Sequence, residues 1–140
     1  MIISSSDVYG RVPGKKGPIT EAFPLEPANF YAGTKAAAEG IAWPFFERGE
    51  VPLTILRPFS HIGPGQAPTF VTSDFARQVA RITLSLAKPE VHVGNIDVFR
   101  SFTDVRDMVR GYRLAYETLK PGSVYHLANE TPVSIRSILE

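Results

Sequence analysis

Short apolar runs alternate along this chain with longer segments that carry a helical period. Apolar runs at 1–3, 51–57, 91–95 and 124–128 predict strands. Segments at about 31–47, 69–82 and 103–119 predict helices, and residues 134–140 predict the start of an amphipathic helix. Because strand and helix alternate in this order, the pattern predicts an α/β fold with parallel strands.

The predicted helices carry recognisable end signals. Gly49 is expected to end the first helix, and either Thr103 or Asp104 is expected to cap the third. The second helix is expected to bury one face, formed by Phe75, Val79 and Ile82. These signals place the helix boundaries within a few residues.

Two loops rich in glycine and proline separate these elements. Residues 11–27 are expected to form a loop, with a turn at 14–18 whose lysine pair faces solvent. Residues 58–68 follow the strand predicted at 51–57. Ligands bind beyond the carboxyl ends of strands in open parallel sheets, so we expect a candidate site near this second loop.

Composition limits the class of protein. With 140 residues, 44% of them hydrophobic, and a net charge of +1, the chain is expected to be one soluble domain or part of one. So small a charge gives no argument for nucleic acid or an anionic membrane as partner. No cysteine is present, which excludes disulfides and thiolate metal sites and permits a cytoplasmic location. The three histidines lack metal-site spacing, and no apolar run approaches the roughly 18 residues of a membrane span.

Tyr31 and Lys35 form the first pair with chemical meaning. They lie four residues apart in the first predicted helix and therefore share one face. A nearby cation favours the phenolate form of a tyrosine, which makes the phenol a usable general acid or base. The alternative is an amphipathic surface pair, because a Tyr and a Lys occur at this spacing by chance in many helices.

The opening stretch, Ser4-Ser5-Ser6-Asp7-Val8-Tyr9-Gly10, follows the first predicted strand. It can be interpreted as a strand end whose serines cap the next turn. Together with the Tyr31 and Lys35 pair, it could instead supply a hydroxyl donor to a reacting oxygen, with a carboxylate nearby.

These motifs, followed by Leu56-Arg57-Pro58-Phe59-Ser60-His61-Ile62-Gly63-Pro64-Gly65, resemble the second half of an extended short-chain dehydrogenase/reductase in order and spacing. The resemblance implies part of a doubly wound, Rossmann-like parallel sheet at 1–66 and an incomplete substrate-binding region at 67–140. It also implies NADP or NAD as cofactor. No glycine-rich dinucleotide-binding loop is present and both ends look cut, so we expect a segment of a longer enzyme.

The resemblance assigns roles to individual residues. It makes Tyr31 the acid/base, Lys35 the group that binds the nicotinamide ribose and tunes the tyrosine, and Ser5 the donor to the reacting oxygen. Asp7 stands where relatives often have Glu, which leaves its separate catalytic role open. The expected cofactor-binding residues are Tyr31, Lys35, Pro58, Phe59, Ser60 and His61. The expected substrate-binding residues are Ser5, Ser60, Phe70, Val71, Asn95 and Arg100. The alternatives are a loop-structural role for His61, a turn role for Asn95 and a surface charge at Arg100.

Within this family the segments 59–66, 70–76, 93–95 and 100–107 look most like reductases of GDP-4-dehydro-6-deoxy-D-mannose, which make GDP-D-rhamnose. GDP-mannose 4,6-dehydratases are the main alternative, but Ser73 and Asp74 stand where these enzymes have Arg-Lys. Other sugar-nucleotide epimerases and dehydratases also stay open. The resemblance implies a GDP-linked sugar substrate and a homodimer formed through the helix of Tyr31. A different class of hypothesis is an inactive remnant that binds a sugar nucleotide or a partner without turnover.

Overall fold

The computed structural model describes residues 1–11 and 18–140. A three-stranded parallel sheet lies at the centre of the fold. This sheet consists of β1 (Ile2–Ile3), β2 (Thr54–Pro58) and β6 (Ser123–Leu127), in the order β1-β2-β6. Leu56 at its middle pairs with Ile3 on one side and with Tyr125 on the other. Ile55 and Leu56 are fully buried, so β2 forms the centre of the core.

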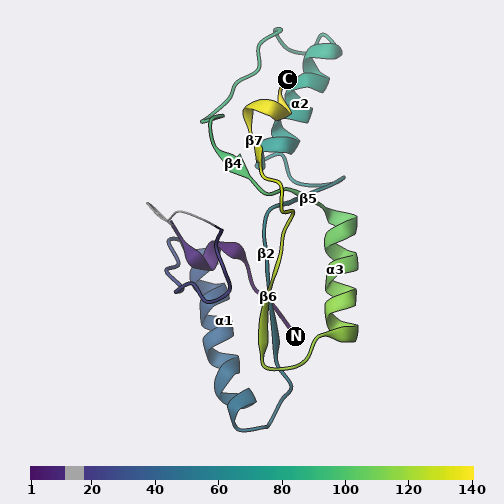
Figure 1. Ribbon diagram of the computed structural model, residues 1–140. Helices are drawn as coiled ribbons and strands as arrows, with labels where there is room; N and C mark the ends of the chain where they lie inside the picture. Colours follow the sequence, from purple (N-terminus) through teal and green to yellow (C-terminus); the bar gives the residue numbers. More distant parts are fainter. Residues whose placement is uncertain (12–17) are drawn as a thin grey trace.

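Two long helices cover opposite faces of this sheet. Figure 1 shows α1 (Phe30–Glu47) on one side of β2 and β6 and α3 (Val105–Thr118) on the other. Met108 and Ala115 are buried on α3, as is Ala32 on α1. A sheet with a helix on each face confirms the predicted α/β class with parallel strands.

The remaining elements lie beyond the carboxyl ends of β2 and β6, together with η1 (Ser6–Tyr9), which directly follows β1 (Figure 1). They are α2 (Val71–Thr83), the parallel pair β3 (His61–Ile62) and β5 (Thr103–Asp104), the antiparallel pair β4 (Phe99–Arg100) and β7 (Val133–Ser134), and η2 (Arg136–Ile138). This is the end of a parallel sheet where ligands bind. The division at residue 66 remains a prediction, and the segment 105–127 returns to the central sheet.

The helix signals in the sequence are largely confirmed. Asp104, one of the two predicted caps, caps α3 by accepting a hydrogen bond from the Arg106 amide. Asn29, which was not predicted as a cap, caps α1 by accepting from the Ala32 amide at 2.8 Å. Helix α1 ends at Glu47, and Gly49 adopts the expected left-handed conformation with φ of 73°.

Three local predictions are wrong or need correction. Residues 91–95 form no strand, because the Gln78 side chain binds both the amide and the carbonyl of His92 in place of a strand partner. Residues 134–140 form no α-helix and contain the last residue of β7 and the short η2. On α2, Phe75 is buried but Val79 is 49% exposed, so the buried face is narrower than predicted. The turn predicted at 14–18, with Lys15 and Lys16, lies almost entirely outside the described residues.

Gly10 is required by the turn that follows η1. Its φ is +61°, and a Cβ at this position would lie 1.9 Å from the carbonyl oxygen of Glu26. We therefore expect Gly10→Ala to lower the free energy of unfolding of the whole protein by about 2 kcal/mol or more. Denaturant titration would measure this. The matched control is Gly40→Ala in α1, where nothing lies within 4 Å of the added Cβ and a gain of up to about 1 kcal/mol is expected. An equal effect of the two changes would contradict the prediction.

Candidate active site

A cavity of about 720 Å³ opens where the ends of β1 and β2 meet the segments around α2 and β4. This volume is within the range of small-molecule sites in proteins. The cavity is lined by Ser5, Ser6, Asp7, Tyr31, Pro58, Phe59, Ser60, His61, Ile62, Gln66, Phe70, Val71, Thr72, Asn95, Val98, Arg100, Phe102 and Ile135. All the site residues expected from the sequence are therefore brought to one cavity, with the exception of Lys35.

Tyr31 and Lys35 lie side by side at the start of α1. The Lys35 ammonium is 5.7 Å from the centre of the Tyr31 ring and donates a hydrogen bond to the Ile3 carbonyl at 3.0 Å. This bond ties the helix to the last residue of β1. An ammonium has three donors, so Lys35 retains capacity for a ligand hydroxyl, while Tyr31 is 53% exposed and opens on the cavity.

Ser5 is both a cap and a cavity residue. Its hydroxyl oxygen accepts a hydrogen bond from the Asp7 amide at 3.2 Å, as the capping interpretation of this stretch expects. The hydroxyl hydrogen is still available to donate, because the cap uses only an oxygen lone pair. Ser5 is 8% exposed, whereas Asp7 is exposed to solvent at the rim.

The loop after β2 is held from two sides. The Phe59 amide donates to the Leu127 carbonyl at 2.8 Å, and the Ser60 carbonyl accepts from the Thr103 amide at 3.0 Å. His61 Nδ1 lies 3.2 Å from the Phe59 carbonyl, which agrees with the alternative of a loop-structural role. These bonds fix the backbone of a loop whose residues line the cavity.

Asn95 and Arg100 form the far side of the cavity. Arg100 is exposed, and its guanidinium donates to the Phe99 carbonyl at 2.8 Å. Within the described part of the chain no carboxylate neutralises Arg100, so its charge is available to an anionic ligand. Asn95 accepts a hydrogen bond from the Asp97 amide at 2.9 Å, so it serves a turn and also faces the cavity.

Sequence reasoning missed several lining residues, of which Gln66 is the most polar. Its amide oxygen accepts from the Thr72 and Ser73 hydroxyls, each at 3.2 Å, and its amide nitrogen donates to the His61 carbonyl. Gln66 lies in the loop expected to meet ligands, so its position was a usable signal. Ile135 carried no such signal, because it reaches the cavity only through pairing of β7 with the distant β4.

Two further features bear on the class of site. The described residues contain no group of three or more His, Cys, Asp or Glu that could hold a metal ion. Among the described helices, none has the length and apolarity needed to span a bilayer. A second cavity of about 650 Å³ lies along α2 and the segment 87–92 and contains none of the predicted site residues.

The parallel sheet, with a Tyr-x-x-x-Lys helix delivered to the carboxyl ends of its strands, defines an extended short-chain dehydrogenase/reductase of the epimerase/dehydratase type. More narrowly, the chain belongs to the GDP-mannose 4,6 dehydratase family, whose profile matches residues 1–140. The family predicted from the motifs is thereby confirmed.

Individual relatives are similar over the whole chain. It is 39% identical to GDP-6-deoxy-D-mannose reductase of Pseudomonas aeruginosa, over 100% of this chain and 46% of the relative. It is 33% identical to GDP-mannose 4,6-dehydratase of Sinorhizobium fredii, over 98% of this chain and 38% of that relative. The solved structure of RMD from Pseudomonas aeruginosa complexed with NADPH matches with a TM-score of 0.92 and 38% identity, over 98% of this chain and 47% of that one. The solved structure of UDP-glucuronic acid 4-epimerase from Bacillus cereus in complex with NAD matches with a TM-score of 0.81 and 30% identity, over 96% of this chain and 42% of that one. The chain therefore spans less than half the length of these relatives.

Proposed function

We propose that the whole protein is an NAD(P)H-dependent reductase that converts the C4 ketone of GDP-4-dehydro-6-deoxy-D-mannose to the alcohol of GDP-D-rhamnose. One observation carries this proposal: Tyr31 and Ser5 come from different elements, open on one cavity, and have Lys35 beside the tyrosine ring. The similarity to GDP-6-deoxy-D-mannose reductase supports the choice of substrate.

Each of these residues has a role in ketone reduction. A bound nicotinamide cofactor supplies the hydride that reaches the carbonyl carbon. Tyr31 donates its hydroxyl proton to the carbonyl oxygen, and Ser5 donates a hydrogen bond that orients this oxygen. The Lys35 ammonium stabilises the phenolate left on Tyr31 and is placed to bond a cofactor hydroxyl. Pro58, Phe59, Ser60 and His61 form the wall facing the cofactor.

The far side of the cavity suits a sugar nucleotide. Arg100 presents paired donors, which match the oxygens of a diphosphate. Asn95 adds an amide for the sugar or nucleotide, and Phe70 and Val71 add an apolar surface. We therefore include in the proposal that the sugar substrate is linked to GDP.

A GDP-mannose 4,6-dehydratase is the second candidate, because the family and two of the relatives carry that name. Its reaction begins with the same hydride step in reverse and could use the same residues. The positions where such enzymes have Arg-Lys favour the reductase here. Ser73 is neutral and bonds Gln66, and Asp74 is an acid that pairs with Arg77 at 2.7 Å, so these two positions present no cation in place of the Arg-Lys.

The test is to give the whole protein GDP-4-dehydro-6-deoxy-D-mannose with NADPH or NADH, follow cofactor oxidation and identify the product by NMR. The reductase oxidises one cofactor per ketone consumed and yields GDP-D-rhamnose. A dehydratase instead consumes GDP-mannose with no net cofactor oxidation. Calorimetry identifies the inactive remnant, which would bind GDP-mannose but not NADPH and turn over neither substrate.

Two further expectations belong to this proposal. A homodimer through α1 is supported by the exposed apolar side chains on one side of this helix, among them Phe30 and Ile41. Sedimentation of the whole protein over a range of concentrations would show whether it dimerises. The cytoplasmic location remains a prediction.

A further inference from the structure

A buried polar cluster lies beside the candidate site and takes no part in the proposed chemistry. Tyr9 is 2% exposed, Arg57 4% and Glu39 1%. Arg57 donates to the two carboxylate oxygens of Glu39 at 3.0 and 2.6 Å, and its Nη1 donates to the Tyr9 hydroxyl at 2.6 Å. A guanidinium has donors only, so the Tyr9 oxygen accepts this bond.

The Tyr9 hydrogen is then directed to His126. The Tyr9 hydroxyl lies 2.6 Å from His126 Nε2, which must be unprotonated to accept a hydrogen bond. His126 is therefore assigned as neutral, with its proton on Nδ1, 3.8 Å from a carboxylate oxygen of Glu21. From Arg57 through Tyr9 to His126, the hydrogen bonds run in one direction.

The surroundings favour this neutral state. Burial lowers the pKa of His126 below its ordinary value of 6.5, and Arg57 on β2 lowers it further, whereas Glu21 from the segment 18–29 raises it. Burial also raises the pKa of Tyr9 in η1, although the hydrogen bond from Arg57 opposes this. Glu39 on α1 lies behind Arg57 and is bonded to it. At neutral pH the Tyr9 hydrogen therefore has a histidine lone pair as its acceptor.

His126 connects this cluster to the wall of the candidate site. Its ring meets the Phe59 ring edge-on, with centres 5.2 Å apart, and the Tyr9 ring in the same way at 5.4 Å. Phe59 lines the cavity together with Ser5 and Tyr31. The Phe59 amide is bonded to Leu127, the residue after His126, so the ring contact and the backbone hold the same wall.

We propose that Tyr9 is a positioning residue, whose hydroxyl holds the His126 ring against Phe59 and so fixes one wall of the candidate active site. Protonation of His126 removes the lone pair that accepts the Tyr9 hydrogen. The Tyr9 oxygen can then accept the N–H groups of both Arg57 and His126, but the buried Tyr9 hydrogen has lost its acceptor, which weakens the hold on the His126 ring and on Phe59. The effect on catalysis rests on the proposed function, whereas the ring geometry does not.

The experiment compares Tyr9→Phe with wild type in the whole protein by NMR, without substrate. The matched control is Tyr125→Phe, next to His126 on β6 but on the opposite face of the strand. In wild type we expect contacts between the His126 and Phe59 rings at neutral pH that weaken as His126 is protonated. Tyr9→Phe removes the donor that favours neutral His126, so it should raise the pKa of His126 and weaken these contacts already at neutral pH. Tyr125→Phe should change neither.

A second variant covers the case in which Tyr9→Phe does not fold. Glu21→Gln removes the carboxylate that raises the pKa of His126, so the loss of ring contacts should move to lower pH. Ring contacts that persist in Tyr9→Phe, or through the titration of His126, would overturn the proposal.

Kinetics then separate the two proposals. With GDP-4-dehydro-6-deoxy-D-mannose and NADPH, Tyr9→Phe should lower kcat/KM by roughly 10- to 100-fold, because small misplacements near reacting groups have effects of this size. If Tyr9→Phe loses the contacts between the His126 and Phe59 rings but keeps the kcat/KM of wild type, the positioning role is refuted. If the rings respond as expected but wild type reduces no such ketone, the proposed function fails and the structural role of Tyr9 stands.

Discussion

Replacement of Tyr31 by Phe is expected to lower kcat of the whole protein by about 10²- to 10⁴-fold, the usual contribution of a general acid. The phenol is the group placed to donate the proton, and phenylalanine keeps the ring while removing only the hydroxyl. Because Tyr31 is 53% exposed, its loss leaves no buried polar partner unsatisfied, and the fold should be unaffected. NADPH affinity, measured by calorimetry, should stay close to that of wild type.

The matched control is Tyr116→Phe, the same chemical change at a residue of α3 that is 75% exposed. This variant should turn over at the wild-type rate. Normal turnover by Tyr31→Phe would remove the acid/base role, and with it the central argument for the proposed reaction. Loss of NADPH binding together with turnover would assign Tyr31 to cofactor binding alone.

The parts of the fold that the sequence predicted well are those whose signals are local. The strand at β2, the left-handed Gly49 that follows α1 and the cap at Asp104 each depend on a few adjacent residues. The candidate site was predicted for a related reason. The residues predicted for its catalytic and cofactor-binding side follow β1 and β2 or begin α1, and these motifs are continuous in the sequence.

The sequence failed where distant segments decide the structure. Residues 91–95 have the apolar character of a strand, yet Gln78 on α2 satisfies the backbone of His92. The contact of Ile135 with the cavity depends on β4 meeting β7. Backbone groups must be paired, but a short apolar run does not specify which partner will pair them.

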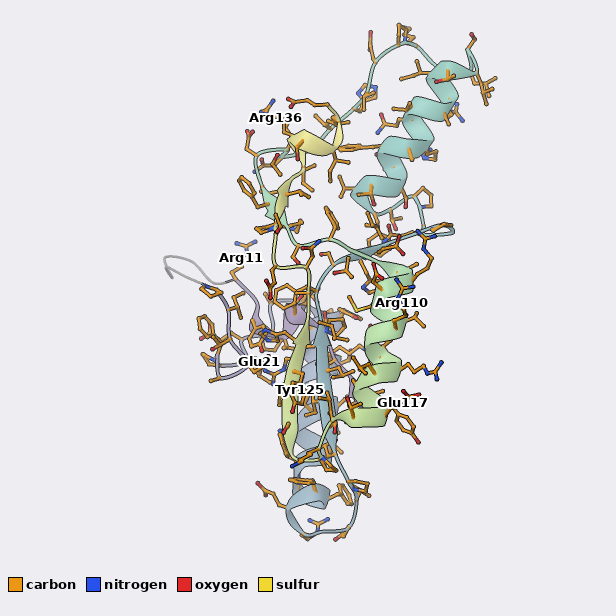
Figure 2. All side chains as sticks on the ribbon, turned by 45° about the vertical axis from the view of Figure 1, so that its right-hand side comes forward. Arg11, Glu21, Arg110, Glu117, Tyr125 and Arg136 are labelled. Atoms are coloured by element: carbon orange, nitrogen blue, oxygen red, sulfur yellow. The ribbon has the colours of Figure 1, made fainter. Side chains whose placement is uncertain are left out.

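The buried Arg57 and Glu39 pair is the clearest example of a feature that local patterns do not reveal. Glu39 lies on α1 and Arg57 at the end of β2, and only the packing of helix on sheet brings them together (Figure 1). Figure 2 shows the contrasting case, in which charged side chains such as Arg110 and Glu117 project from the outer face of α3. A charge on a helix usually means a solvated face, so a buried one is seen only in the structure.

Arg57→Met is expected to lower the free energy of unfolding by about 3–5 kcal/mol, because it leaves the Glu39 carboxylate buried without its partner. Side-chain exposures of 5% for Arg57 and 2% for Glu39 mean that water cannot replace the lost bonds. The double variant Arg57→Met/Glu39→Leu should recover much of this loss, since two apolar side chains leave no charge behind. Denaturant unfolding of the whole protein measures the double variant and the two single variants, Arg57→Met and Glu39→Leu.

The control is the surface pair of Arg113 and Glu117, which is of similar length at 2.7 Å but has exposures of 79% and 49%. Arg113→Met should lower the free energy of unfolding by less than about 1 kcal/mol, because solvent screens an exposed pair. If Arg57→Met lowers the free energy of unfolding no more than Arg113→Met does, then burial gives the Arg57 and Glu39 pair no special contribution to stability. If the double variant is as unstable as the sum of the single changes, the two residues act independently. Recovery in the double variant would show that the pair itself joins α1, and with it Tyr31 and Lys35, to the strand that ends at the candidate site.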